Sequence, residues 1–123
     1  AGRVTAMHDP TEGGLASALW EMAQACGHTF TIDRTAVRIP ELSARICALF
    51  DLDPLATIAS GALLFTTPRE DASQITRALE AAGIACMQIG SVEPGGPAVY
   101  TTDGPARELL PRPARDEITR VYE

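Results

Sequence analysis

The sequence contains no lysine, and all ten of its basic residues are arginine. Sixteen acidic residues outnumber them and give a formal net charge of −6. An acidic surface repels phosphate backbones, and the arginines form neither a basic stripe nor a pattern interleaved with aromatic residues, which make up only 5% of the chain. The composition therefore argues against a nucleic-acid partner.

Long apolar runs are also lacking, since none approaches the roughly 20 residues that a membrane-spanning helix needs. A membrane partner is therefore not expected. The chain opens without a signal-peptide pattern and as if cut from something longer, which predicts a piece of a larger protein. Hydrophobic residues nevertheless make up 46% of its 123 residues, enough for the core of one domain over residues 1–123.

Only three cysteines are present, and no two of them form a CxxC pair, which excludes a zinc ribbon or a thioredoxin-type motif. Cys26, Cys47 and Cys86 each lie among apolar residues, where a free cysteine commonly packs as a small hydrophobe. A reactive thiol would need a neighbouring cation, and no cysteine has an adjacent basic residue. We expect core packing, a cytoplasmic location and no metal site.

The spacing of apolar residues predicts three helices. Residues 15–26 place their apolar side chains on one face and are followed by Gly27, a typical C-terminal cap. A third helix is expected over residues 70–82, ended by Gly83. The second begins after Pro40, and its predicted buried stripe consists of Leu42, Ile46, Leu49 and Phe50.

Strands are predicted over residues 28–32, 62–66, 84–92 and 98–101. The second of these is expected to be buried on both faces, and the last two to form an antiparallel hairpin around a Gly-Gly-Pro turn. The tail is expected to be irregular over 105–113, with a last helical turn or two over 116–122. Alternating helices and strands predict an α/β (α+β) domain, layered, with a mixed sheet and helices.

One dense polar cluster, Met7–Leu15, immediately precedes the first helix. Gly13 and Gly14 would let the backbone approach a ligand and leave the first-turn N–H groups directed toward an anion. His8 and Asp9 are candidates for proton transfer or metal coordination. The alternative is structural, with Asp9 or Thr11 capping the helix and the glycines forming a tight turn. The phosphate-binding patterns GxxxxGK[ST] and GxGxxG are both missing.

The single tryptophan, Trp20, lies off the apolar face of the first predicted helix. It either covers the edge of the core or faces a further domain, since an exposed aromatic residue typically marks an interface.

The stretch Val4–Gly14 resembles the opening of the C-terminal domain of the aminoimidazole ribonucleotide (AIR) synthase-related superfamily, which includes PurM and HypE. The shared pattern D-x-T-x-G-G is matched by Asp9, Thr11, Gly13 and Gly14, and the leading His8 is most similar to the HypE branch of hydrogenase-maturation factors. Weaker similarities over residues 52–55, 61–64 and 89–92 extend the resemblance across nearly the whole chain. It implies a PurM C-terminal-domain-like, partly ferredoxin-like fold.

The resemblance also implies an ATP-dependent enzyme of two domains that works as a homodimer. The N-terminal ATP-binding domain, absent from this chain, would form most of the dimer interface and carry the acidic residues that hold Mg²⁺. In this chain His8 and Asp9 would be catalytic, and Thr11, Gly13 and Gly14 would bind the nucleotide phosphates. The reaction in this family activates an amide or carboxylate-type oxygen by phosphoryl transfer.

Two departures from HypE bear on the substrate. HypE ends in a cysteine that carries the group to be dehydrated, whereas this chain ends Val121-Tyr122-Glu123. Ser60 also stands where HypE has a glutamate. The resemblance therefore implies a HypE-like paralogue with a different substrate, whose partners are its own N-terminal domain and other metalloenzyme-maturation proteins. The alternative is a non-catalytic binding or scaffold paralogue in metalloenzyme maturation.

Overall fold

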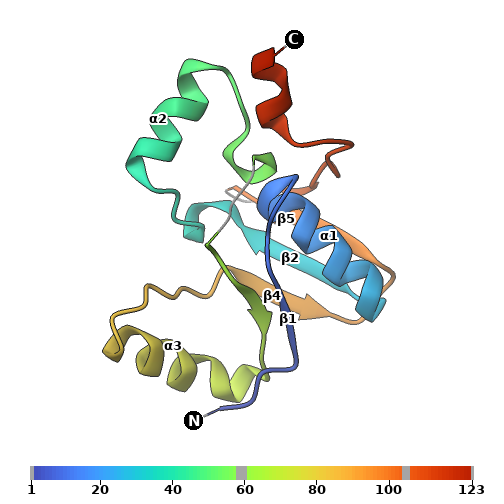
Figure 1. The fold of residues 1–123 in the computed structure, drawn as a ribbon. Coiled ribbons are helices and arrows are strands. Elements are labelled where there is room, and N and C mark those ends of the chain that lie inside the picture. Colours follow the sequence, from blue (N-terminus) through green and yellow to red (C-terminus); the bar gives the residue numbers. More distant parts are fainter. Residues whose placement is uncertain (1, 58–60, 104–105, 123) are drawn as a thin grey trace.

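The computed structural model describes residues 2–57, 61–103 and 106–122. It confirms the predicted class, a layered α/β (α+β) arrangement of helices and a mixed sheet (Figure 1). Its main elements are β1 (Ala6–His8), α1 (Gly14–Cys26), β2 (Thr29–Asp33), α2 (Glu41–Leu49), β3 (Leu64–Thr66), α3 (Ala72–Ala81), β4 (Gly90–Glu93), β5 (Ala98–Thr102) and β6 (Arg107–Leu109). The 3-10 helices are η1 (Arg34–Ala36), η2 (Pro54–Ala56), η3 (Arg69–Asp71) and η4 (Glu117–Tyr122).

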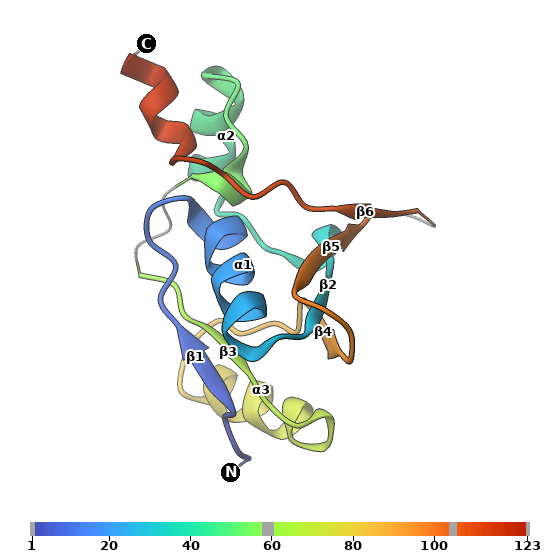
Figure 2. The same cartoon turned by 90° about the vertical axis from the view of Figure 1, so that its right-hand side faces the viewer.

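The main sheet has four strands in the order β4-β2-β5-β6. β2 runs antiparallel to β4 and parallel to β5, and β5 runs antiparallel to β6. β1 and β3 form a separate two-stranded antiparallel ribbon. α1 and this ribbon lie on the same side of the main sheet, with α2 at one end of the molecule and α3 at the other (Figure 2).

The predicted hairpin between residues 84–92 and 98–101 is wrong, because β2 lies between the two strands. Thr29 at the start of β2 is opposite Glu93 on one side and Ala98 on the other. The connecting loop passes around this end of β2, where the Thr29 hydroxyl donates a hydrogen bond to the Gly96 carbonyl at 2.8 Å. A Gly-Gly-Pro turn predicts that the chain reverses but does not reveal a third strand between the two arms.

Three other strand predictions also need correction. Of residues 84–92, only the last part forms a strand, β4, and residues 84–89 are irregular. β3 is not buried on both faces: Leu64 is buried, but Phe65 and Thr66 are half-buried and the preceding Leu63 is exposed. The tail predicted to be irregular contains β6, which extends the sheet at its edge.

The hydrophobic core lies between α1 and the sheet. α1 buries Ala18, Leu19 and Ala23, as its apolar spacing predicted, against Phe30 and Val99 of β2 and β5. Gly27 ends the helix with φ 72°, and its N–H donates to the Ala23 carbonyl at 2.9 Å. The sequence pattern was sufficient to predict the buried face of α1 because this face packs against strands of the same chain.

Trp20 covers the edge of this core rather than facing away from it. Its side chain packs partly buried against the core, and its indole N–H donates to the carbonyl of Leu110 at 2.9 Å. Leu110 follows β6 and is only 1% exposed. The contact therefore attaches the chain beyond β6 to α1.

α2 begins after Pro40 as predicted, but its predicted stripe is not buried. Leu42, Ile46, Leu49 and Phe50 are all exposed, Leu49 to 78%. Cys47 is the residue of this helix that is buried. The helix is thus in the expected place with its apolar face turned outward.

The cysteines differ in their surroundings, although all three are unpaired. Cys47 is buried as predicted, Cys86 is half-buried, and Cys26 is exposed at the end of α1, so its predicted core packing is wrong. Within the described ranges, no helix has both the length and the apolar character required to cross a membrane.

β2 ends in a side-chain cap. The Asp33 carboxylate accepts hydrogen bonds from the Thr35 hydroxyl at 2.6 Å and from the Thr35 backbone N–H at 2.9 Å. These bonds, that of the hydroxyl most of all, hold the pKa of the exposed Asp33 carboxyl below its usual value. They also start η1, which leads the chain away from the sheet toward α2.

Candidate functional site

The polar cluster forms the turn between β1 and α1, and both of its glycines adopt the left-handed backbone conformation. Gly13 has φ 78° and Gly14 has φ 63°. The Gly14 N–H donates to the Thr11 carbonyl at 3.0 Å, and the Ser17 N–H donates to the Gly13 carbonyl at 3.2 Å. The predicted tight glycine turn is therefore present, and it leads directly into α1.

The alternative that Asp9 or Thr11 caps α1 with its side chain is wrong. The helix has no side-chain capping hydrogen bond, and both residues are exposed. No described residue makes a hydrogen bond to either side chain. A helix start leaves several backbone N–H groups without intrahelical partners, so the cap must come from elsewhere.

The cap comes from Asp116, near the end of the chain. One carboxylate oxygen of Asp116, Oδ2, accepts the Gly13 N–H at 2.7 Å, and the other, Oδ1, accepts the Ile118 N–H at 2.9 Å. Asp116 is only 6% exposed. A carboxylate is favourable at this place because the start of a helix carries partial positive charge.

Sequence reasoning missed Asp116 as a partner of the turn. An aspartate ahead of a short helix is a typical N-cap, and its bond to Ile118 shows that role. Its bond to Gly13 joins residues separated by 103 positions, for which the sequence has no local signal.

The glycines are also required by packing. A Cβ at Gly14 would overlap the Thr57 carbonyl oxygen and lie 2.6 Å from the Leu55 carbonyl oxygen. A Cβ at Gly13 would overlap the side chain of Ser17. The turn therefore fits closely against η2 and the first turn of α1, whether or not a ligand is bound.

His8 lies apart from the glycine turn. Its Nε2 contacts the Glu21 carboxylate of α1, an ion pair when the imidazole is protonated. Glu21 lies about two turns beyond Gly14, which is about 10 Å along the helix axis at 1.5 Å per residue. The structure thus brings Thr11, Gly13 and Gly14 together, with Asp9 beside them, and pairs His8 with a residue that sequence reasoning did not single out.

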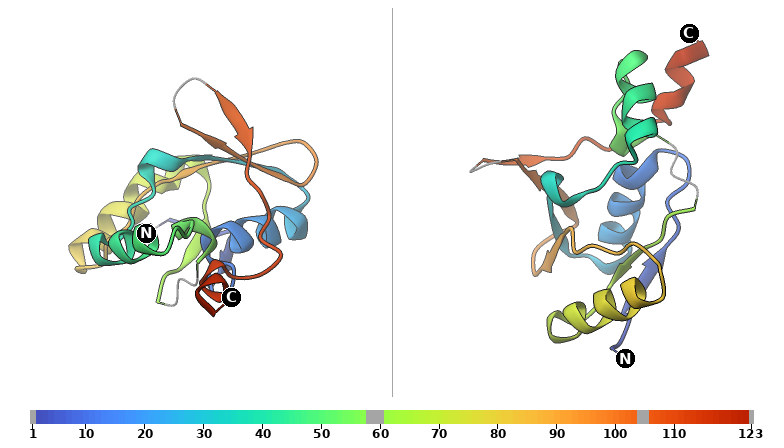
Figure 3. Two further views of the ribbon diagram at one scale, coloured as in Figure 1. Left: turned by 90° about the horizontal axis from the view of Figure 1, so that it is seen from above. Right: turned by 90° about the vertical axis from the view of Figure 1, so that its left-hand side faces the viewer.

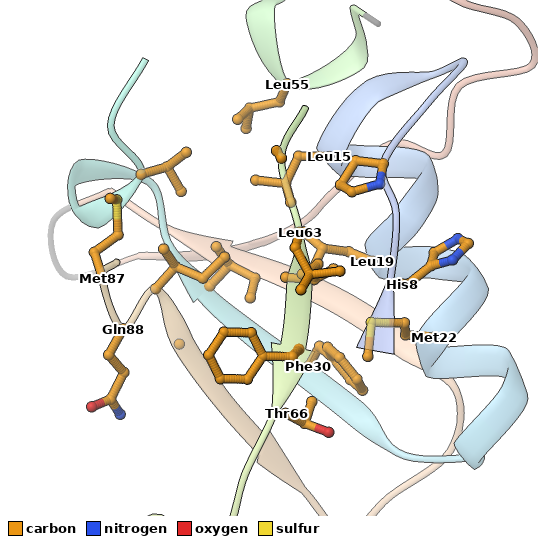
Figure 4. Close-up of a pocket in the computed structure, with 18 of the residues that line it drawn as sticks. His8, Leu15, Leu19, Met22, Phe30, Leu55, Leu63, Thr66, Met87 and Gln88 are labelled. Atoms are coloured by element: carbon orange, nitrogen blue, oxygen red, sulfur yellow. The ribbon is translucent and has the colours of Figure 1, made fainter. Parts of the chain in front are cut away.

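A cleft of about 1380 Å³ lies between α1, the main sheet and β3, with His8 at its margin (Figure 4). Apolar side chains such as Leu19, Met22 and Phe30 line its interior. Polar side chains, among them Glu21, His28 and Arg38, also border it.

The fit of these residues to a nucleotide and its metal is partial. The exposed Thr11 hydroxyl and the positive end of α1 suit a phosphate oxygen, but the Gly13 N–H is already donated to Asp116. Across the described ranges no group of three or more His, Cys, Asp or Glu side chains gathers to hold a metal ion. Ser60, for which the resemblance implied a departure from HypE, lies outside the described residues.

Residues 1–102 match the family described as AIR synthase related protein, C-terminal domain. The chain therefore belongs to this family, and the resemblance of the Asp9–Gly14 pattern to it is confirmed.

Its relatives include proteins of hydrogenase maturation. The chain is 31% identical over 123 residues to a putative hydrogenase expression/formation protein of Methanocaldococcus jannaschii, covering 97% of this chain and 36% of that protein. It is 36% identical over 78 residues to the carbamoyl dehydratase HypE of Rhodobacter capsulatus, covering 63% of this chain and 23% of the relative. The crystal structure of HypE in complex with ATP superposes with a TM-score of 0.83 at 27% identity, covering 92% of this chain and 37% of that one. The chain thus spans little more than a third of these proteins at most.

Proposed function

We propose that this chain is the C-terminal domain of a HypE-like, ATP-dependent enzyme that activates an amide or carboxylate-type oxygen by phosphoryl transfer. The observation that carries the proposal is the match in fold to HypE, which has been solved with ATP, together with an intact Asp9–Gly14 pattern placed at the start of α1. Such chemistry needs mainly positioning and charge stabilisation from the protein, and a helix start behind a glycine turn supplies both.

The site residues have distinct proposed roles. Thr11, Gly13 and Gly14 bind a phosphate group, and Asp9, exposed beside them, faces the reacting groups. His8 takes part in proton transfer, with Glu21 fixing the orientation of its ring. Mg²⁺, which neutralises the phosphate charge when bound, is held mainly by acidic residues outside this chain.

The rest of the proposal concerns the complete protein. It works as a homodimer in the cytoplasm, and residues 1–123 form one domain that closes over a nucleotide held by an N-terminal domain. Its substrate differs from the HypE cysteine, and its partners are other metalloenzyme-maturation proteins. Support comes from its relatives of hydrogenase maturation, of which this chain covers only part.

One observation favours a second function, a non-catalytic binding or scaffold role in metalloenzyme maturation. The Gly13 N–H already has a buried carboxylate as its partner, and both glycines are required by packing. The turn is thus explained without any ligand, as it would be in a paralogue that has lost catalysis.

The test measures ATP binding by calorimetry and ATP turnover in the complete natural protein with Mg²⁺. Asp9→Asn and Thr11→Val change exposed side chains that form no hydrogen bond or ion pair with a described residue, so the melting temperature should stay within a few degrees of wild type. We expect turnover to fall at least roughly tenfold in each, the usual effect of losing a positioned catalytic or binding group. Asp103→Asn, at an exposed position beyond β5, is the matched control and should leave turnover unchanged.

The two functions give different outcomes. Turnover that depends on Asp9 and Thr11 supports the enzyme. ATP binding without turnover, unaffected by either variant, would favour the scaffold and leave the glycine turn as a structural feature.

A further inference from the structure

The chain beyond β6 is bonded to the rest of the molecule at its start, in its middle and at its end. We call residues 110–121 the C-terminal segment. At its start, the Leu110 N–H donates to the Val99 carbonyl at 2.8 Å, and at its end Arg120 Nη1 donates to the Asp51 carbonyl at 3.0 Å. Between them Asp116 binds the Gly13 N–H. In two views the segment runs past the start of α1 and ends beside α2 (Figures 2 and 3).

The middle contact is the one that bears on function. Asp116 is nearly completely buried, and its oxygen lies 2.7 Å from the Gly13 nitrogen, a short charge-assisted hydrogen bond. An N–H group donates to one strong acceptor at a time, and two anions at one helix start repel each other. A phosphate group at Gly13 and the Asp116 carboxylate are therefore mutually exclusive.

We propose that the C-terminal segment is an intramolecular latch on the glycine turn, in which Asp116 competes with a phosphate group for the Gly13 N–H. This inference rests on the proposed function and adds its regulation: phosphate binds fully only when the outer part of the segment, residues 116–121, is released. The apparent affinity for phosphate is then reduced by the fraction of molecules in which the latch is closed.

The latch is held by a buried contact at Asp116 and an exposed contact at Arg120, and each contact can be weakened separately. Asp116→Asn keeps the shape of the side chain but removes its charge from the Gly13 N–H. Arg120→Ala removes the hydrogen bond to the Asp51 carbonyl and leaves the glycine turn unchanged. The Arg120 side chain is 44% exposed. The first change removes a negative charge and the second a positive one, so a common effect on ATP affinity cannot come from net charge.

The experiment titrates Mg-ATP into the complete natural protein and each variant by calorimetry, with adenosine as the probe that lacks phosphate. Weakening the latch should raise the affinity for ATP roughly tenfold in Asp116→Asn, because a hydrogen bond to a charged group is lost. In Arg120→Ala the rise should be about two- to fivefold, as for an exposed contact. Adenosine affinity should not change. Glu93→Gln, an exposed carboxylate on β4 with no partner among the described residues, loses the same charge as Asp116→Asn and should bind ATP as wild type does.

The amide resonances of Gly13 and Ile118 in NMR spectra report the release of the segment directly. Asp116 accepts both the Gly13 and the Ile118 N–H, so ATP binding to the wild type should shift both amide resonances in step. Ile118 lies on η4, away from the turn in sequence, and would not respond if phosphate were bound without release.

The possible results separate the latch from the proposed function. Tighter ATP binding in both variants supports the latch. Unchanged or weaker binding in Asp116→Asn overturns it, because the carboxylate would then serve only to hold the turn. Failure of ATP to bind to the wild type and to every variant would overturn the proposed phosphate site and the latch together.

Discussion

Gly14 and Gly27 both have left-handed backbone conformations, yet the structure gives them different reasons to be glycine. Gly27 has φ 72°, and a Cβ there would meet nothing within 4 Å. Gly14 has φ 63°, and a Cβ there would overlap the Thr57 carbonyl and crowd the Leu55 carbonyl. The second glycine thus allows a close approach of two backbone segments as well as an unusual backbone conformation.

Replacing each glycine with alanine should separate these two requirements. Gly27→Ala should lower the free energy of unfolding by about 1 kcal/mol, the cost of a left-handed conformation for an alanine. Gly14→Ala should lower it by about 3 kcal/mol or more, since overlap with backbone atoms is added and these cannot rotate away. Urea denaturation monitored by tryptophan fluorescence measures both. Equal losses would show that η2 moves freely away from α1.

The glycine turn could be predicted from the sequence, whereas the partners of its site could not. A pair of glycines ahead of an amphipathic helix is a local signal, and the turn forms where it was expected. Asp116 and Glu21 bind Gly13 and His8 through contacts that depend on how separate segments come together. A single sequence contains no pattern that links such residues.

At the scale of elements, α2 shows what an apolar pattern can and cannot predict. The period of its apolar residues places the helix correctly after Pro40, because the period depends on the helix alone. Which face is buried depends on what packs against it, and in this structure the face of Leu49 and Phe50 is exposed while Cys47 and the following Leu52 are buried. The same limit explains why the predicted hairpin was wrong. The position of a strand depends on the local sequence, whereas its order in the sheet depends on contacts between distant segments.

This arrangement predicts opposite results for two leucines close together in the chain. Leu49→Ser should change the free energy of unfolding by no more than about 0.5 kcal/mol, because the side chain is already 78% exposed. Leu52→Ala should cost about 2 to 3 kcal/mol, because a side chain that is 6% exposed leaves a cavity. Chemical denaturation of each variant tests the pair. A large loss in Leu49→Ser would mean that this face of α2 is buried after all.

At the scale of the whole molecule, the C-terminal segment holds the layers together. Leu110 is 1% exposed in the core, its carbonyl accepts the Trp20 indole N–H, and its N–H is bonded to Val99 of β5. The neighbouring Leu109 lies on β6 at the edge of the sheet and is 57% exposed. Adjacent leucines therefore have opposite roles.

The two leucines supply a matched test of whether this segment belongs to the cooperative unit. Leu110→Ala should lower the free energy of unfolding by about 2 to 5 kcal/mol, since it leaves a cavity beside Trp20 in the core. Leu109→Ala, with the same change in size, should stay within about 0.5 kcal/mol of wild type. Thermal unfolding followed by circular dichroism and by the fluorescence of the single tryptophan should give coincident transitions in both variants. If Leu110→Ala unfolded in two steps, with tryptophan fluorescence changing first, the segment would detach from α1 independently of the sheet. The proposed latch does not require this, because only its outer part, residues 116–121, has to leave the glycine turn.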